Sequence, residues 1–504
     1  MANETIASLV ARAARRDPAA GAILAPGGET LSYGELAEEI ARVARALRAR
    51  GVARGDRAAW IAAGGPQAAV AFLGSAAACA SAPINPALGP RELRAQLEDL
   101  RPRIVLLAGE QHSAGAAARA LGIEVMELRA RPDGRPGFAL PEGRSEVEEA
   151  GPEDVALVLH TSGTTARPKQ VPLGHRSLCV AARNVASTLR LSDADRALNM
   201  MPLFHIHGLV AGLLASLSAG SSVVCAPGFD PRGVREWVAR LRPTWYSAVP
   251  AIHMAMRDAF EGTPPDGGFP FRFARSSSSA LPPAVMGALE TLYGAPVLEA
   301  YGMTEAAHQI ASNPLPPAQR KPGSVGLPAG PEVAIRDPQG RDASTGVEGE
   351  VWIRGETVVR GYHDNPDANA ESYANGWFRT GDLGRLDADG YLWLTGRLKE
   401  LVNRGGEKIA PAEVDNVLLE HPDVAQAACC AMPHPTLGEE VAAVVVLRPG
   451  AVDVTVRDLL AHCASRLAPF KRPKQILIVP ELPRSATGKV QRRGLWEAVA
   501  PPRA

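Results

Sequence analysis

Apolar and polar positions along the first third of the chain predict helices and strands in alternation. Ser32-Tyr33-Gly34-Glu35 has the form of a capping box, and apolar residues then recur at helical spacing until Gly51. We expect a strand over residues 57–62, an alanine-rich helix over 66–79 and a turn over 83–90. Such alternation is typical of a layered α/β domain with a mainly parallel sheet.

The same alternation continues through the middle of the chain. Residues 132–152 are rich in Pro, Gly and Glu and predict a loop between subdomains, and the apolar segment 155–159 that follows is strand-like. Residues 177–189 predict a helix, and 271–281 predict a strand that runs into a serine-rich turn. Open α/β sheets usually bind ligands where strands end in small polar residues, so this turn is a candidate site.

Composition excludes several classes of function. The 504 residues include 54 basic and 54 acidic side chains, so no net charge attracts nucleic acid or an anionic membrane. Six scattered cysteines without a Cys-x-x-Cys motif favour reduced thiols over disulfides or a zinc site. The N-terminus lacks a basic region followed by an apolar block, and no apolar run approaches the ~20 residues of a membrane span. We therefore expect a soluble cytoplasmic protein, in which any phosphate binding depends on local groups.

The run from Thr161 to Lys169 has the composition of a phosphate-binding loop. It contains four hydroxyl side chains, one Gly and two cations, and hydroxyls, backbone amides and cations all bind phosphate oxygens. It lacks the Gly-x-x-x-x-Gly-Lys-Ser/Thr form, and Pro168 before Lys169 favours a loop over a helix cap. The alternative is a solvated loop without function.

Three later segments carry further candidate groups. His205 and His207 lie two residues apart beside Gly208, although either could be a satisfied core histidine. In the 271–281 segment, Arg272 or Arg275 and the serines could line a pocket or form an ordinary polar loop. In the third segment, Tyr301 could stack on a purine and Thr304 could bind phosphate. Glu305 could hold magnesium, and His308 would lie beside it if a helix begins there.

The last quarter of the chain adds a ribose site and a basic tail. Asp382 can accept two hydrogen bonds from ribose hydroxyls, and Arg397 could hold it in place. Nine Lys and Arg residues against two Glu residues in the segment 466–503 would suit the phosphates of coenzyme A, or serve solubility alone.

These motifs together resemble the adenylate-forming acyl-CoA synthetase family over roughly residues 150–493. Thr161–Lys169 resembles its signature loop, with Ala166 and with Gln170 just after it at positions where the family prefers Gly. The other matching segments are 201–208, 298–305, 376–382 with 396–400, 405–409 and 483–492. The resemblance implies a large layered N-terminal domain of mainly parallel sheets over residues 1–398 and a small mobile C-terminal α/β domain over 399–504. Lys399 falls at the family's hinge.

The resemblance implies a two-step reaction that uses ATP, Mg²⁺ and coenzyme A. A carboxylate attacks the α-phosphate of ATP to give an acyl adenylate, and the CoA thiol then displaces AMP. The implied catalytic residues are His205, Thr304, Glu305 (also the metal ligand) and Lys489. The implied nucleotide and CoA ligands are Thr161, Ser162, Gly163, Thr164, Thr165, Lys169, Tyr301, Thr304, Asp382, Arg397, Gly406, Arg472 and Lys474.

Within the family, the chain looks closest to the oxalate-CoA ligases through His160, Arg275-Ser276 and the segments 204–208, 304–308, 312–316 and 403–409. The implied substrate residues are His205, His207, Arg275, Ser278 and His308. Such a set would penalise a long alkyl chain, which cannot satisfy buried polar groups, and would favour a second carboxylate. Gly302 stands where that branch carries Ala, so the exact acid stays open. Alternatives are malonate or another small acid, an adenylation enzyme that loads a carrier protein, and a nucleotide-binding protein that has lost catalysis.

Overall fold

The helix predicted after Ser32 forms and begins at the predicted capping box. In the computed structural model, α2 (Tyr33–Arg48) is capped by Ser32, whose hydroxyl accepts a hydrogen bond from the Glu35 amide while the Glu35 carboxylate accepts one from the Ser32 amide. α3 (Gly65–Ala78) is buried around its whole circumference, as its alanine-rich sequence permits. Both helices confirm the predictions from periodicity within a residue or two.

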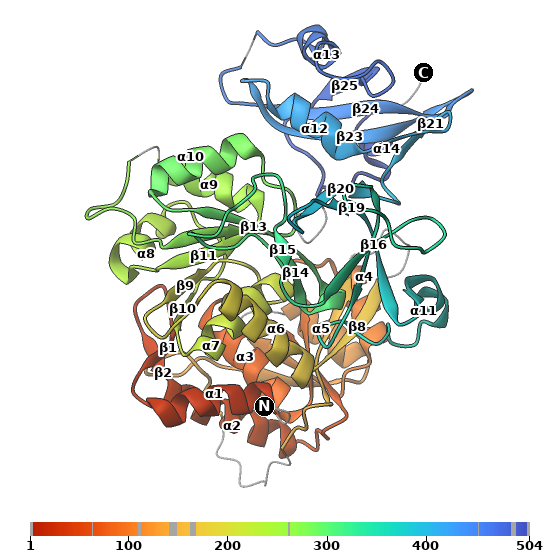
Figure 1. Ribbon diagram of the computed structural model, residues 1–504. Helices are drawn as coiled ribbons and strands as arrows, with labels where there is room; N and C mark the ends of the chain where they lie inside the picture. The colour runs from red at the N-terminus through yellow and green to blue at the C-terminus, as the bar shows by residue number, and fades with distance from the viewer. Residues whose placement is uncertain are drawn as a thin grey trace. The chain divides into compact units, whose positions relative to one another are not determined.

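The structure describes residues 4–62, 64–108, 112–140, 149–161, 168–260, 263–451, 453–484 and 490–500. The chain divides into two compact units (Figure 1). The described residues within 4–161, 168–332 and 354–376 belong to the first unit, and those within 333–353 and 377–500 belong to the second. The structure thus groups residues 377–398 with the C-terminal part, whereas the sequence places a domain boundary at Lys399, which stays a prediction.

The first unit contains a six-stranded sheet that is parallel except at one edge. Its strands, in spatial order, are β6 (Glu124–Leu128), β5 (Ile104–Ala108), β3 (Arg57–Ile61), β4 (Ala80–Ile84), β7 (Val155–Thr161) and β8 (Lys169–Gly174). The antiparallel pair β7/β8 sets Thr161 opposite Lys169. Apolar residues of α4 (Pro90–Leu100) and α5 (His112–Ala120) form a core with residues of this sheet.

A nine-stranded sheet forms the rest of this unit's framework. Its spatial order is β15 (Leu327–Pro328), β14 (His308–Ser312), β13 (Val297–Met303), β12 (Phe273–Ser276), β11 (Trp245–Ala248), β9 (Arg196–Asn199), β10 (Ser222–Cys225), β1 (Gly21–Leu24) and β2 (Thr30–Ser32). The central pairs are parallel, and those at the two ends of the sheet are antiparallel. α8 (Gly233–Leu241), α9 (Pro250–Phe260) and α10 (Pro283–Tyr293) share an apolar core with this sheet.

Helices also pack between the two sheets. α3 contacts strands of the six-stranded sheet and β10, and α6 (His175–Thr188) contacts β7, β8 and β14. α1 (Ile6–Arg16) packs on α2, α3 and α6, while a π-helix, η1 (His207–Leu214), continues into α7 (Ala215–Ala219). This layering of helices and mainly parallel sheets confirms the predicted fold class.

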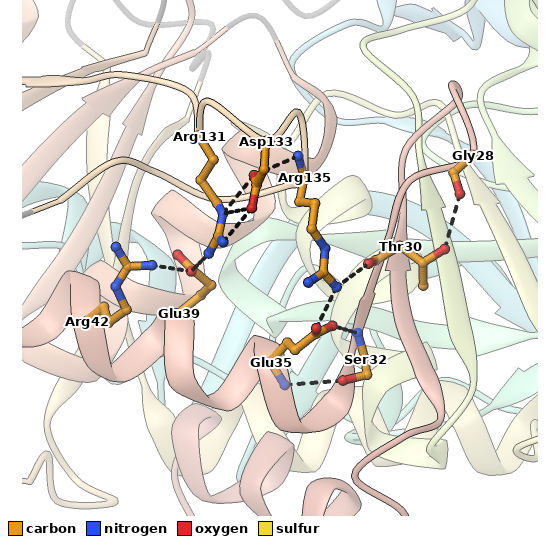
Figure 2. Close-up of polar contacts among 9 residues, drawn as sticks. All are labelled: Gly28, Thr30, Ser32, Glu35, Glu39, Arg42, Arg131, Asp133 and Arg135. Atoms are coloured by element: carbon orange, nitrogen blue, oxygen red, sulfur yellow. Dashed lines mark hydrogen bonds and ion pairs between the residues drawn. The ribbon is translucent and has the colours of Figure 1, made fainter.

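The predicted loop after residue 131 is tied to α2 by charged side chains. Figure 2 shows the Glu39 carboxylate between the guanidinium groups of Arg42 and Arg131, and Arg135 beside Glu35. Glu39 is buried, so these hydrogen-bonded cations compensate a carboxylate that water cannot reach. Residues 141–148 of the predicted loop lie outside the described part of the chain.

The second unit contains two further sheets. β16 (Glu332–Arg336), β17 (Gly349–Arg354), β19 (Trp377–Leu386) and β20 (Leu392–Arg397) pair in one of them, and β22 (Glu407–Ile409), β21 (Val402–Arg404), β24 (Gly438–Leu447), β23 (Val424–His434) and β25 (Gln475–Ile478) form the other. α12 (Pro411–Leu419) and α13 (Val456–Ala464) share one core with the latter sheet, and α14 (Leu495–Val499) shares a second. The first unit also contains α11 (Pro366–Ser372) and β18 (Tyr373–Ala374).

An α-helix after Thr304, which would have placed His308 beside Glu305, does not form. A single 3-10 turn, η2 (Thr304–Ala306), ends at left-handed Ala307, and β14 begins at His308.

All six cysteines are free and buried. None of the helices in the described part of the chain has the length and apolar character needed to span a bilayer.

Candidate functional site

Two neighbouring strands of the nine-stranded sheet bring polar side chains into the interior. Ser247 on β11 lies in register with Arg275 on β12, so both side chains share one face of the sheet. Arg275 is fully buried and donates to Ser247 Oγ (3.1 Å), His308 Nε2 (3.1 Å) and Gln309 Oε1 (3.1 Å). We refer to His207, Ser247, Arg275, Ser278, His308 and Gln309 as the Arg275 cluster.

Hydrogen bonds and ring contacts fix the orientation of the two histidines of this cluster. Because a guanidinium can only donate, His308 accepts at Nε2 and carries its proton on Nδ1. Burial, followed by the nearby Arg275 charge, holds the pKa of His308 well below its ordinary value, so this side chain is neutral. The His207 ring stacks on His308 with centroids 5.0 Å apart and contacts Ser247 Oγ (2.6 Å) and Ser278 Oγ (3.1 Å). Ser278 is half-buried and therefore marks the end of the cluster nearer to solvent.

The Arg275 charge has no acidic partner among the described residues. Its Nε atom is buried and makes no hydrogen bond there, and burial lowers the pKa of the guanidinium to about 9, so it remains a cation at neutral pH. Arg272, which directly precedes β12, differs: it is exposed and pairs with Asp195 at 2.9 Å. A buried cation is stabilised by an anion, so the Arg275 cluster is suited to bind one.

The position of His308 depends on a close approach between two strands. A Cβ atom at Gly302 on β13 would lie 1.6 Å from the His308 carbonyl oxygen, so only glycine fits this backbone. The β13/β14 register shifts at this point, and His308 has a φ of +105°, which side-chain-bearing residues rarely adopt. The two strand ends thereby aim His308 toward Arg275.

A second group of polar residues surrounds Glu305. This carboxylate is buried in η2 and accepts a hydrogen bond from the Tyr362 hydroxyl at 2.9 Å. The Lys169 ammonium lies over the face of the same Tyr362 ring, 4.5 Å from its centroid. Thr304, the preceding residue, is half-buried. Three side chains from separate parts of the sequence thus meet within the first unit.

This group fits a magnesium ion brought by a nucleotide. Within the described residues, Glu305 pairs with no cation, which leaves a buried carboxylate suited to a metal. No group of three or more acidic, His or Cys side chains that could hold a metal occurs in that part of the chain. Mg²⁺ commonly takes one or two carboxylates and completes its coordination with phosphates and water, so a single Glu305 suffices.

The other predicted residues of the first unit lie on β13, on β7 and β8, and just before η1. Tyr301 is buried on β13, and His205 is half-buried with its ring beside Phe204, the centroids 4.6 Å apart. Thr161 ends β7 opposite Lys169, which begins β8. The signature-loop residues between them, Ser162, Gly163, Thr164 and Thr165, lie outside the described residues.

The predicted residues of the second unit fall on strands and turns. Asp382 on β19 lies opposite Arg397 on β20, and Arg397 Nε donates to Asp382 Oδ1 at 2.6 Å, consistent with the predicted orienting role. Lys399 is exposed in the turn after β20, and Gly406 lies in the β21/β22 turn with a φ of +98°. Arg472 donates to the Leu467 carbonyl at 2.8 Å, and Lys474 is exposed. Lys489 lies outside the described residues.

The structure therefore brings together four of the five predicted substrate residues and adds others that the sequence did not indicate. His207, Arg275, Ser278 and His308 belong to one cluster. Ser247, Gln309 and Tyr362 were missed. Ser247 and Tyr362 lie outside the motifs that resemble the family, and only the adjacency of Gln309 to His308 could have suggested the place of Gln309.

Comparisons with known proteins cover nearly the whole chain. Residues 10–363 match the family model described as AMP-binding enzyme, and residues 413–489 match the one described as AMP-binding enzyme C-terminal domain. The chain is 40% identical to an oxalate–CoA ligase from Arabidopsis thaliana over 98% of both sequences, and 39% identical to a sulfoacetate–CoA ligase from Cupriavidus necator over 97% of both. The solved structure of ATP-bound MatB from Rhodopseudomonas palustris has a TM-score of 0.86 and 31% identity, with 98% of each chain covered.

Proposed function

The chain belongs to the AMP-binding enzyme family as an AMP-forming acid–CoA ligase, and we propose that its acid is a short dicarboxylate, with oxalate first. The supporting observation is the fully buried Arg275, a cation without an acidic partner among the described residues. A monocarboxylate with an apolar tail would leave that charge uncompensated. A second carboxylate, held by Arg275 and by the hydroxyls and imidazoles around it, would neutralise it.

The reaction joins the acid to coenzyme A in two displacements. One oxygen of the reacting carboxylate attacks the α-phosphorus of ATP, the bond to the bridging oxygen of the β-phosphate breaks, and pyrophosphate leaves. The CoA thiol then attacks the acyl carbon, loses its proton, and expels AMP as the bond between that carbon and the AMP oxygen breaks. The first displacement brings an anion toward a polyanion, so electrostatic stabilisation is the main requirement of the site.

We assign the nucleotide phosphates to the group around Glu305 in the first unit. Lys169 would contact phosphate oxygens, with Thr304 and the Thr161–Thr165 loop as hydrogen-bond donors. Glu305 would hold Mg²⁺, which supplies positive charge to the phosphates when bound. Tyr301 would stack on the purine, and His205 would lie beside the reacting carboxylate.

Residues of the second unit receive roles by resemblance. Asp382, oriented by Arg397 at 2.6 Å, would accept hydrogen bonds from the ribose hydroxyls. Lys489 would stabilise charge in the first displacement, and Lys399 would be the hinge of a C-terminal domain over 399–504. Gly406, Arg472 and Lys474 would serve the thioester-forming step, the last two by binding CoA phosphates. A cytoplasmic location is part of the proposal, supported by the six free cysteines.

A second anion other than carboxylate would also suit the cluster. The relative from Cupriavidus necator is named for sulfoacetate, which carries a sulfonate beside its carboxylate. Malonate differs from oxalate by one methylene, which places the second carboxylate farther from the reacting one. Selection among these acids is therefore a matter of the distance between two anions.

The decisive experiment compares acids in a pyrophosphate-release assay. Oxalate, malonate, sulfoacetate, acetate, hexanoate and benzoate would be assayed with the native enzyme and with Arg275→Met. We expect oxalate to have the highest kcat/KM and Arg275→Met to abolish the preference for dianionic acids. Arg272→Met is the matched control, because this arginine directly before β12 is already paired with Asp195. A native preference for hexanoate or benzoate over both diacids would contradict the proposal.

A further inference from the structure

Tyr362 lies between two side chains of opposite charge and contacts both. Its hydroxyl donates to Glu305 Oε1 at 2.9 Å, and its ring face lies 4.5 Å from Lys169 Nζ. Among the described residues, Lys169 and Glu305 form no direct ion pair, and each contacts Tyr362. We propose that Tyr362 is a positioning residue that keeps Lys169 and Glu305 apart, so that the lysine stays available to phosphate oxygens and the glutamate to Mg²⁺.

The segment that carries Tyr362 is fixed at several points. The Val359 amide donates to the Glu305 carbonyl at 2.8 Å, and the His363 amide donates to the carbonyl of Gln170, the residue after Lys169, at 3.0 Å. Asn369 in α11 accepts from the Tyr362 amide at 2.7 Å and donates to its carbonyl at 3.0 Å. The backbone around Tyr362 is therefore bonded to the same two segments whose side chains its ring separates.

The chemistry of the phenol suits this role. The electron-rich face of the ring attracts an ammonium group, and the hydroxyl is a neutral donor that stabilises a carboxylate. Burial and the Glu305 charge raise the pKa of Tyr362, which keeps the hydroxyl protonated and able to donate. The charges of Lys169 and Glu305 are thus each stabilised by a neutral group of Tyr362 and are not neutralised by an ion pair.

Without the ring, the two charges would be free to pair directly. Tyr362 and Glu305 are both buried, and attraction between opposite charges is strong where water is excluded. A Lys169–Glu305 ion pair would satisfy both side chains and would compete with the nucleotide and the metal. The tyrosine therefore excludes an inactive arrangement as well as supporting the active one.

Two substitutions separate the functions of the hydroxyl and the ring. Tyr362→Phe removes the hydrogen bond to Glu305 but keeps the ring, so we expect the Mg²⁺ concentration for half-maximal activity to rise about 10-fold. Tyr362→Leu also removes the ring and permits direct pairing, so we expect kcat/KM for MgATP to fall about 100-fold or more. The KM for the acid should stay unchanged in both variants.

A double-mutant cycle tests the spacing role itself. In a Lys169→Ala background no ion pair can form, so Tyr362→Leu should be no worse there than Tyr362→Phe. An undiminished difference between Leu and Phe in that background would overturn the inference. Tyr373→Phe is the matched control: this hydroxyl donates to the Val359 carbonyl in the same segment, and its loss should leave the Mg²⁺ requirement unchanged. An equal Mg²⁺ shift in Tyr373→Phe would reduce Tyr362 to a structural role.

The inference rests on the proposed roles of Lys169 and Glu305 in binding MgATP. Lys169→Ala and Glu305→Ala are therefore measured first with the same titrations. If neither changes the use of MgATP, the proposed nucleotide site is wrong. If both do and the Tyr362 variants behave like the native enzyme, the spacing inference alone is wrong.

Discussion

Nη1 of Arg275 lies 3.1 Å from Nε2 of His308, so a buried guanidinium donates to a neutral imidazole and not to a carboxylate. The sequence predicted both residues to belong to a polar set that favours a second carboxylate. The hydrogen bond and the lowered pKa of His308 instead leave Arg275 as the cation of this pair. His308 orients the guanidinium and has no charge of its own to offer.

Substitutions at these two residues should therefore differ in size. Arg275→Gln removes the charge that pairs with the second carboxylate, and we expect at least ~100-fold lower kcat/KM for oxalate. His308→Gln retains a neutral acceptor and should lose only about 10-fold. Steady-state kinetics with varied oxalate would measure both, while the KM for ATP should not change. A larger loss from His308→Gln than from Arg275→Gln would contradict the assignment of charge to Arg275.

Glu305→Ala and Asp382→Ala should both weaken the use of MgATP, for different reasons. The first removes the proposed metal ligand, and the second removes the proposed ribose acceptor. Excess magnesium should therefore partly restore Glu305→Ala and leave Asp382→Ala unchanged. Titration of Mg²⁺ at fixed ATP would show this, and rescue of both variants or of neither would refute the assigned roles.

Lys489→Ala should separate the two displacements. We expect adenylate formation to be abolished and thioester formation from a supplied acyl adenylate to be largely retained, because the lysine stabilises charge only in the first step. Pyrophosphate release and CoA consumption would be followed in separate assays. Equal losses in both would indicate a structural lysine.

The first unit should lose stability in mild acid. Burial lowers the pKa of His175 and of His253 to about 4, whereas both titrate near 6.5 when unfolded. Between these values the unfolded chain binds more protons, so the free energy of unfolding falls as the pH drops through 6.5 and levels off near 4. From pH 7.5 to pH 5 the loss is about 2 kcal/mol for each histidine.

Urea unfolding at the two pH values would measure this loss. His253→Gln removes one titrating group. The free energy of unfolding of this variant should therefore fall between pH 7.5 and pH 5 by about 2 kcal/mol less than that of the native enzyme. An unchanged pH dependence in that variant would show that His253 contributes nothing to acid sensitivity.

Arg492→Met should destabilise the second unit. Arg492 pairs with buried Asp415 at 2.5 Å, and burial raises the pKa of Asp415 despite this partner. Loss of the cation leaves a buried carboxylate uncompensated and should lower the free energy of unfolding by about 3 kcal/mol. Arg466→Met is the control, because its pair with Glu420 is exposed and should be worth less than about 1 kcal/mol.

The Arg492→Met effect can be confirmed by removing the other charge. Asp415→Asn in the Arg492→Met background should restore part of the stability, since no charge then remains buried. If the loss in free energy of unfolding of the double variant equals the sum of the losses in the two single variants, packing and not charge accounts for the effect.

The sequence predicted the fold class because local signals and global architecture agree in this chain. The capping box at Ser32 and the periodicity after it specify α2, and the alternation of helices and strands specifies layered sheets. Other elements have no local signature. Strand β4 is buried along its whole length and includes Pro83, so part of it read as a turn, and the apolar segment that forms η1 has no periodicity that distinguishes a π-helix.

The candidate site was predictable in its residues but not in its arrangement. Sequence alone could not choose between Arg272 and Arg275, which lie three positions apart in one predicted strand. β12 begins at Phe273, after Arg272, and only Arg275 is buried. The helical spacing from Glu305 to His308 failed because left-handed Ala307 ends the turn between them. Tyr362 joins Lys169 to Glu305 through tertiary contacts that no spacing reveals.

A substitution at Gly302 could change which acids this enzyme accepts without replacing any residue around its proposed anion site. Any larger residue there must displace the backbone that carries His308 and Gln309, since a Cβ would meet the His308 carbonyl oxygen at 1.6 Å. A single codon change could therefore shift two hydrogen-bond partners of Arg275 at once, without altering their identity. Libraries that aim to redirect the enzyme to longer diacids should vary position 302 before the residues that line the cluster.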